Sequence, residues 1–248
     1  MSDNKAIRVH KLSKRFGDFT AVDAITFEVD RGEIFGFLGA NGAGKTTAIR
    51  MLIGLNRPSA GEASVAGFDV YKETDQLKEN IGYMSQKFSL YEDLSIRQNI
   101  RFYGGIYGLN RAAIRQKTDQ ILTDLKLEDF ADQVVGALPL GWKQRLAFAV
   151  STVHDPAIVF LDEPTGGVDP ATRRQFWEMI YASAHEGRTV FVTTHYMDEA
   201  EYCNRVSIMV AGKIEAMGTP RQLKEQFRAD TMDEVFLRLV RKEEAEKT

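Results

Sequence analysis

Short runs of apolar residues, each about as long as a buried strand, recur through the first third of the chain. One of these runs, Ile34–Leu38, leads into a glycine-rich segment, and the residues that follow at positions 47–54 have the pattern of a helix. The pattern therefore predicts a strand, a glycine loop and a helix in direct succession. The other strands expected in this region are at residues 7–9, 24–29 and 63–68.

Helical periodicity replaces this pattern between about residues 88 and 155, where strand signals are few. Strand-length apolar runs alternating with helical segments return from Ala157 onward. Strands separated by helices predict an α/β fold with a largely parallel sheet, so the helical block is an insertion. The elements expected in the last region are strands at residues 157–161, 189–193 and 206–210, and helices at residues 172–185 and 198–203.

The expected organisation follows from these patterns. Residues 1–87 and 156–230 form the core, residues 88–155 form an inserted helical subdomain, and residues 231–248 form a C-terminal helix with a charged tail. A chain of 248 residues is long enough to bury a large core unaided.

Composition narrows the class of protein. The net charge is only −3, so we expect no nucleic-acid partner, and Cys203 is the single cysteine, which favours a reducing compartment. The N-terminal residues lack the apolar stretch of a signal peptide, and no run approaches 18 apolar residues. We therefore expect a chain that does not cross a membrane itself.

The glycine loop has a recognisable chemistry. Residues 39–46 fit the P-loop pattern G-x-x-x-x-G-K-[ST], and here the loop stands between a predicted strand and a predicted helix, as the pattern requires. Glycines allow a tight fold around phosphate, and the helix N-terminus points partial positive charge at it. Lys45 adds a charge for the β- and γ-phosphates, and Thr46 places a hydroxyl on Mg²⁺. The predicted nucleotide-binding residues are Gly39, Asn41, Gly42, Ala43, Gly44, Lys45, Thr46 and Thr47.

Two carboxylates, Asp162 and Glu163, come directly after the apolar run at residues 158–161. Ligands of open α/β sheets bind at the carboxyl ends of the strands. Beside a P-loop, Asp162 is suited to hold hydrated Mg²⁺, and Glu163 to orient or deprotonate the attacking water. The alternative is a strand-end turn with two solvated acids.

With these motifs the chain resembles the ATP-binding subunits of ABC transporters over nearly its full length. That family implies a P-loop NTPase core with an N-terminal antiparallel β region and an inserted helical subdomain. Phe16 matches the aromatic residue that stacks on adenine, and Gln86 the glutamine that contacts Mg²⁺ and senses the γ-phosphate. Asp169 matches the loop that crosses the dimer interface, and His195 the switch histidine at the γ-phosphate. Glu163, His195 and Gln86 are thus the expected catalytic residues, and Thr46, Gln86 and Asp162 the expected metal ligands.

Each of these assignments has an alternative. Phe16 could be an ordinary core residue, and Gln86 a polar residue at a strand end. His195 follows a buried strand, so it could be a structural histidine with its hydrogen bonds satisfied.

One motif departs from the family. Where the family usually reads Leu-Ser-Gly-Gly-Gln, this chain has Pro139 in place of the serine and Leu140 in place of the first glycine, and Gly141 remains. In the family this segment clamps the γ-phosphate of ATP held by the partner's P-loop. Gly141 and the helix behind it still present N–H groups, but losing a charge-assisted donor costs on the order of 1.5–3 kcal/mol.

The resemblance implies ATP and Mg²⁺ as cofactors, a homodimer or another paired nucleotide-binding domain, and an integral membrane permease as partner. The altered signature is similar to that of some bacterial multidrug-export ATPases, so an exporter subunit on the cytoplasmic face of the membrane is expected. The alternative is a nucleotide-switched ATPase or scaffold outside transport, with weak hydrolysis.

For two apolar segments the sequence allows two different packing partners. The aromatic and aliphatic residues after Gln86 either pack the helical block or line a groove for a permease helix. The apolar face of a helix at residues 233–240 either packs on its own domain or serves as the tail helix of an exporter ATPase. The residues concerned are Phe88, Leu90, Tyr91, Leu94, Ile96, Ile100, Phe102, Tyr103, Ile106 and Tyr107 in the first segment, and Val235, Phe236, Leu239 and Val240 in the second.

Overall fold

The computed structural model describes residues 4–87 and 90–246, with side chains through residue 241. Its strands are β1 (Lys5–Phe16), β2 (Phe19–Asp30), β3 (Ile34–Leu38), β4 (Ala60–Val65), β5 (Phe68–Asp69), β6 (Ile81–Met84), β7 (Ile158–Asp162), β8 (Thr189–Thr194), β9 (Arg205–Val210) and β10 (Lys213–Gly218). Its α-helices are α1 (Lys45–Leu52), α2 (Thr74–Asn80), α3 (Ile96–Ile106), α4 (Arg111–Leu125), α5 (Leu140–Ser151), α6 (Pro170–His185), α7 (Pro220–Phe227) and α8 (Met232–Glu246), and three 3₁₀ helices are η1 (Glu128–Phe130), η2 (Val135–Ala137) and η3 (Met197–Tyr202).

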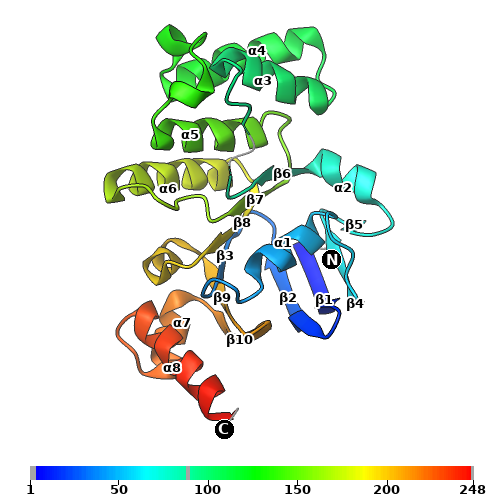
Figure 1. Ribbon diagram of the computed structural model, residues 1–248, viewed down its shortest axis with the longest axis vertical. Coiled ribbons are helices and arrows are strands. Elements are labelled where there is room, and N and C mark those ends of the chain that lie inside the picture. Colours follow the sequence, from blue (N-terminus) through cyan, green and yellow to red (C-terminus); the bar gives the residue numbers. More distant parts are fainter. Residues whose placement is uncertain (1–3, 88–89, 247–248) are drawn as a thin grey trace.

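The central sheet has the strand order β10-β9-β3-β8-β7-β6 (Figure 1). Every pair is parallel except β9 with β10, which confirms the largely parallel sheet expected from the sequence. Strands β3, β7 and β8 are buried at every position, as strands covered on both faces must be. Since parallel strands end at the same edge, the residues after β3, β7 and β8 come together there.

The N-terminal antiparallel sheet, in the order β2-β1-β4-β5, is also confirmed. Strands β1 and β2 are far longer than expected, because polar residues alternate with the apolar ones that face the core. The single strand expected at residues 63–68 is wrong, because Ala66 and Gly67 have positive φ angles and turn the chain between β4 and β5.

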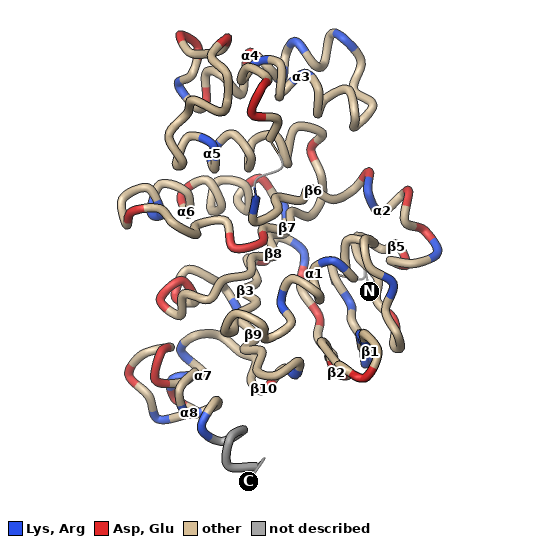
Figure 2. The backbone as a smooth tube through the Cα atoms, in the orientation of Figure 1, with Lys and Arg blue, Asp and Glu red and all other residues tan. Residues whose placement is uncertain are grey.

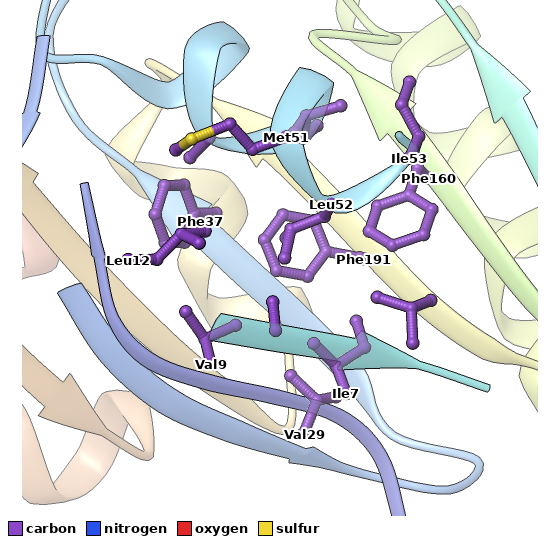
Figure 3. Packing of buried hydrophobic residues seen from close by; sticks show 14 of the residues in the cluster. Ile7, Val9, Leu12, Val29, Phe37, Met51, Leu52, Ile53, Phe160 and Phe191 are labelled. Carbon is purple, nitrogen blue, oxygen red and sulfur yellow. The ribbon is translucent and has the colours of Figure 1, made fainter. Parts of the chain in front are cut away.

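A hydrophobic core fills the space between this sheet, helix α1 and one face of the central sheet (Figure 3). Ile7 and Val29 from the antiparallel sheet meet Leu52 of α1 and Phe191 of the central sheet in the same cluster. Burial of this cluster holds α1 against the sheet, and so fixes the loop that precedes α1.

Helices α3, α4 and α5 form a separate layer above the central sheet in Figure 1, with their own hydrophobic cluster. Ser95 caps α3 through a capping box and Asn110 caps α4, which explains where these helices begin. Of the apolar residues expected here, Ile96 and Ile100 are fully buried and pack this layer. Phe88 lies outside the described residues, and the most exposed members of the set are Tyr91, Phe102 and Ile106.

Of the two alternatives for the apolar face at residues 233–240, the structure shows packing on its own domain, by helix α8. Val235 and Leu239 are buried in the second core cluster, and Phe236 and Val240 pack against it. The helix expected at residues 198–203 is the 3₁₀ helix η3. Strand β6 was expected only in the alternative for Gln86, and strand β10 and helices α2 and α7 were not expected. No helix in the described part of the chain is long and apolar enough to span a membrane.

Candidate functional site

The glycine loop joins β3 to α1, as the sequence predicts. Gly44 is the N-cap of α1 with φ 106°, and Gly39 and Gly42 also have positive φ angles. Helix α1 starts two positions before the expected residue 47, at Lys45, and no described side chain caps it. Its first-turn N–H groups therefore remain suited to an anionic ligand.

Lys45 is almost completely buried beneath this loop. Its Nζ donates hydrogen bonds to Gly39 O at 2.8 Å and Ala40 O at 3.1 Å, and lies 3.2 Å from Glu163 Oε1. A buried ammonium requires such partners, and they hold its charge at the base of the loop.

Asp162 ends strand β7, and its carboxylate is buried beside α1. Its Oδ1 accepts hydrogen bonds from Thr193 Oγ1 at 2.7 Å and from Thr46 Oγ1 at 3.3 Å. Burial raises the pKa of the Asp162 carboxyl above its ordinary value, and the two threonine hydroxyls act against that rise. A cation bound beside Asp162 and Thr46 would offset the cost of burying this charge.

Glu163 is the point at which the predicted residues meet. Besides Lys45, its carboxylate accepts a hydrogen bond from Gln86 Nε2 at 3.1 Å and lies 3.2 Å from His195 Nδ1, although that last contact lacks hydrogen-bond geometry. Its backbone has φ 49°, an unfavourable conformation for a residue with a side chain. The N–H of Glu163 bonds to both the carbonyl and the hydroxyl of Thr193, and these bonds help to hold it there.

The P-loop borders a cavity of about 440 Å³. Its volume lies in the usual range for small-molecule sites. The cavity is lined by Phe19, Ala21, Asn41, Gly42, Gly44, Lys45, Thr46, Thr47, Gln86 and Glu163. Of the other predicted loop residues, Gly39 and Ala43 lie buried behind it.

Phe19 is a lining residue that sequence reasoning missed. It is paired with Phe16 across the tip of the β1–β2 hairpin, and their relative exposures are 66% for Phe19 and 51% for Phe16. The alternative that Phe16 is a core residue is therefore wrong. Phe16 lies under Lys14, with Nζ 5.0 Å from its ring centre, and is not among the lining residues of the cavity. The signal for Phe19 was an aromatic residue directly after a Gly-Asp turn, where no core residue is needed.

Gly141 and Asp169 lie near each other, on either side of Thr172, and neither is among the residues that line the cavity. Asp169 caps α6 by accepting from Ala171 N at 2.9 Å and Thr172 N at 3.0 Å, and from Thr172 Oγ1 at 2.6 Å. The Thr172 hydroxyl, more than the backbone N–H groups, lowers the pKa of Asp169. Gly141 lies against the same threonine, since a Cβ on Gly141 would be 2.6 Å from Thr172 Cγ2.

A family profile described as "ABC transporter" matches residues 22–166, which include the P-loop, Gln86, Asp162 and Glu163. The chain belongs to the ABC transporter ATP-binding family. Nucleotide binding and ATP hydrolysis are the activities of this family, and the matched residues include most of those that line the cavity at the P-loop.

Relatives and solved structures of this ABC family agree with the match. A probable multidrug ABC transporter ATP-binding protein of Escherichia coli is 48% identical over 239 residues, covering 94% of this chain and 41% of the relative. A Nod factor export ATP-binding protein of Burkholderia lata is 39% identical, covering 88% of this chain and 72% of the relative. An ATP-binding subunit of an ABC transporter has a similar structure, with a TM-score of 0.85 and 27% identity, covering 94% of this chain and 99% of that one. The chain thus spans only about two fifths of the E. coli relative's length.

Proposed function

We propose that this chain binds Mg²⁺-ATP at the P-loop cavity and hydrolyses it to drive an export-type ABC transporter. The observation that carries the proposal is the convergence of Lys45, Gln86 and His195 on Glu163, next to the Asp162–Thr46 pair. A cluster of this kind at the carboxyl ends of parallel strands is what phosphoryl transfer to water requires.

The P-loop backbone, with Asn41, Gly42, Gly44 and Thr47, would cradle the phosphates. The Lys45 ammonium now contacts Glu163 and the loop carbonyls, and it is suited to exchange these partners for the β- and γ-phosphates when ATP binds. This exchange would release Glu163 to accept a hydrogen bond from water. Gln86 and His195, both in contact with Glu163, would orient that carboxylate and the γ-phosphate.

The donors present fit a magnesium ion. Thr46 offers a hydroxyl, Asp162 a carboxylate and Gln86 an amide oxygen, all hard oxygen ligands. Magnesium supplies charge neutralisation at the phosphates and is commonly held by one or two carboxylates plus the substrate.

The site needs a second cassette to be complete. Gly141 and Asp169 share Thr172 on a surface outside the cavity, an arrangement that suits contact with ATP bound by a partner copy. Pro139 is the N-cap of α5 and offers no side-chain donor, so the clamp on that phosphate would rely on backbone N–H groups. This favours pairing through an interface that closes less tightly than one with a serine.

A purified-chain assay tests the proposal. Phosphate release from ATP should require Mg²⁺ and saturate with ATP, and it should disappear in EDTA. If phosphate release does not exceed the no-protein background at any MgATP concentration, the alternative of a nucleotide-binding scaffold with little turnover replaces the ATPase.

Phe19 and Phe16 give a prediction about the adenine. Since Phe19 borders the cavity, we expect Phe19→Ala to weaken ATP binding about 5- to 30-fold, the value of one lost aromatic stack of about 1–2 kcal/mol. The measurement is displacement of a fluorescent ATP analogue, with inorganic triphosphate as the control ligand, whose affinity should not change. Phe16→Ala is the matched variant: a larger loss there than at Phe19 would return the base-stacking role to Phe16.

A permease is the proposed membrane partner, and the relatives' names are consistent with it. An apolar groove of about 480 Å³ lies between the core and the helical layer. Leu55 and Ile106, two of its lining residues, are 57% and 59% exposed, and Tyr83 and Tyr107 also line it. A short amphipathic helix of a permease would bury these side chains, and would place the chain on the cytoplasmic face of the membrane.

The groove can be tested by pull-down with a detergent-solubilised candidate permease. We expect Leu55→Asp and Ile106→Asp to reduce capture at least about 10-fold, since each buries a charge against apolar surface. Leu237→Asp is the control, because Leu237 is a similarly exposed leucine on α8. Equal capture by all three variants would show that the groove is not the docking site.

A further inference from the structure

Beyond the expected motifs, a continuous set of contacts leads from Asp169 at the start of α6 to His195. Asp169 accepts the N–H of Arg173 at its carbonyl, 3.0 Å away, within the first turn of the helix. Arg173 is mostly buried, with a side-chain exposure of 18%, and it points at the segment that follows β8. That segment begins with His195 and Tyr196 and continues into η3.

Three groups of this segment hold the Arg173 guanidinium. Its centre lies 4.1 Å from the centre of the Tyr196 ring, a close cation–π contact. Its Nη1 is 3.3 Å from Asp198 Oδ2, and its Nε is 3.5 Å from Glu199 Oε1. The guanidinium therefore packs on the Tyr196 ring and is hydrogen-bonded to Asp198, whereas its contact with Glu199 is an ion pair without hydrogen-bond geometry.

Glu199 is the decisive member of this set, because it is completely buried. Its Oε1 accepts a 2.6 Å hydrogen bond from the hydroxyl of Thr165, and its Oε2 has no hydrogen-bond partner among the described residues. A buried carboxylate needs a counter-charge, and Arg173 supplies it. Thr165 stands two positions after Glu163. The Thr165–Glu199 hydrogen bond therefore also restrains the backbone that follows the proposed catalytic carboxylate.

The other end of the contacts reaches the site itself. The Tyr196 ring lies 4.1 Å from the His195 ring, centre to centre, and His195 Nδ1 lies 3.2 Å from Glu163 Oε2. Arg173 is thus linked to His195 through the Tyr196 ring. It is linked to the segment after Glu163 through Glu199 and Thr165. Arg173 itself makes no contact with the P-loop cavity.

We propose that Arg173 is a positioning residue that sets His195 against Glu163 and transmits to them any displacement of the loop at Asp169. The role rests on the proposed ATPase function, since its effect on rate is exerted through those two residues. A buried ion pair adds little to stability compared with apolar packing, so fixing a geometry is the use to which it is suited here.

Arg173→Gln removes the charge and the cation–π contact while keeping a polar side chain of moderate length. We expect kcat for ATP hydrolysis to fall about 10- to 30-fold and KM for ATP to change less than about 2-fold, since the nucleotide contacts are intact. Arg174→Gln is the matched control, because the Arg174 side chain is 84% exposed and pairs with Glu178 on the helix surface. A fall in kcat of the same size in both variants overturns the proposal.

The unpaired Glu199 charge could by itself destabilise Arg173→Gln, and a double variant separates the two effects. Arg173→Gln with Glu199→Gln removes both charges, so the melting temperature should return toward that of the unmodified chain. The positioning role predicts that kcat stays low in this double variant. Recovery of kcat together with stability would make the pair merely structural and overturn the proposal.

A measurement without turnover keeps this test apart from that of the proposed function. The chain has four histidines, so the ring resonance of His195 can be assigned by NMR with a His195→Gln variant. Arg173→Gln should shift the His195 resonance and leave those of His10 and His185 in place, whether or not ATP is hydrolysed. An unmoved His195 resonance overturns the inference, whereas absence of hydrolysis with a shifted resonance counts only against the ATPase function.

Discussion

Replacing Glu163 by glutamine should lower kcat for ATP hydrolysis by about 10²- to 10⁴-fold, the usual range for losing a general base. The amide keeps the size of the side chain and its contact with Gln86, but it accepts no proton from water. It also loses the ion pair with Lys45, so the ammonium becomes more available to phosphate. ATP affinity should therefore be preserved or improved while turnover stops.

The same variant should accumulate in the ATP-bound state. Size-exclusion chromatography with MgATP should then show Glu163→Gln eluting as a dimer at protein concentrations where the unmodified chain is monomeric. Glu62→Gln, at an exposed position on β4, is the control and should hydrolyse ATP normally. Equal rates for Glu163→Gln and the unmodified chain would mean that the measured activity does not arise at this site.

Much of this site could be predicted because its residues lie in short motifs. Each of Lys45, Asp162 and His195 follows a strand-length apolar run, and parallel strands end at one edge of the sheet. Order along the chain therefore sufficed to place them together. Phe19 and Arg173 could not be found in this way, because their contacts depend on the twist of a hairpin and on the angle at which α6 packs.

The fold shows the same division. The fully buried strands β3, β7 and β8 were evident, since burial on both faces favours a mostly apolar run of residues. Strand β10 was missed because it is an edge strand with mixed exposure, paired with β9 alone. The turn at Ala66 and Gly67 was missed because only the glycine signals a positive φ angle in the sequence, and the alanine before it does not.

Charged side chains of both signs are spread along the chain. Figure 2 shows Lys and Arg interspersed with Asp and Glu along most of the backbone. Several of these groups form pairs between layers, as Lys117 of α4 and Arg188 before β8 do with the shared carboxylate of Asp155. That the chain has no nucleic-acid partner stays a prediction from the net charge.

Gly44→Ala should abolish tight ATP binding, with a loss of at least about 30-fold, equivalent to about 2 kcal/mol. Gly44 has φ 106°, where an alanine is strained, and its Cβ would lie only 2.4 Å from Ala21 O and 2.8 Å from Met209 Cε. The Met209 side chain can give way, but the Ala21 carbonyl belongs to the backbone of strand β2, so the loop must move instead. Moving Gly44 displaces the start of α1 and with it Lys45 and Thr46, the residues expected to hold phosphate and magnesium.

Gly42→Ala is the matched control, because it makes the same substitution two residues earlier in the same loop. Gly42 also has a positive φ angle, of 83°, but a Cβ there meets nothing within 4 Å. Only the conformational strain remains, about 1 kcal/mol, so ATP affinity should fall about 5-fold or less. Calorimetric titration with MgATP measures both affinities, and circular dichroism verifies that each variant is folded. If the two alanines weaken binding equally, contact with Ala21 does not fix the loop, and the backbone freedom of glycine alone explains both positions.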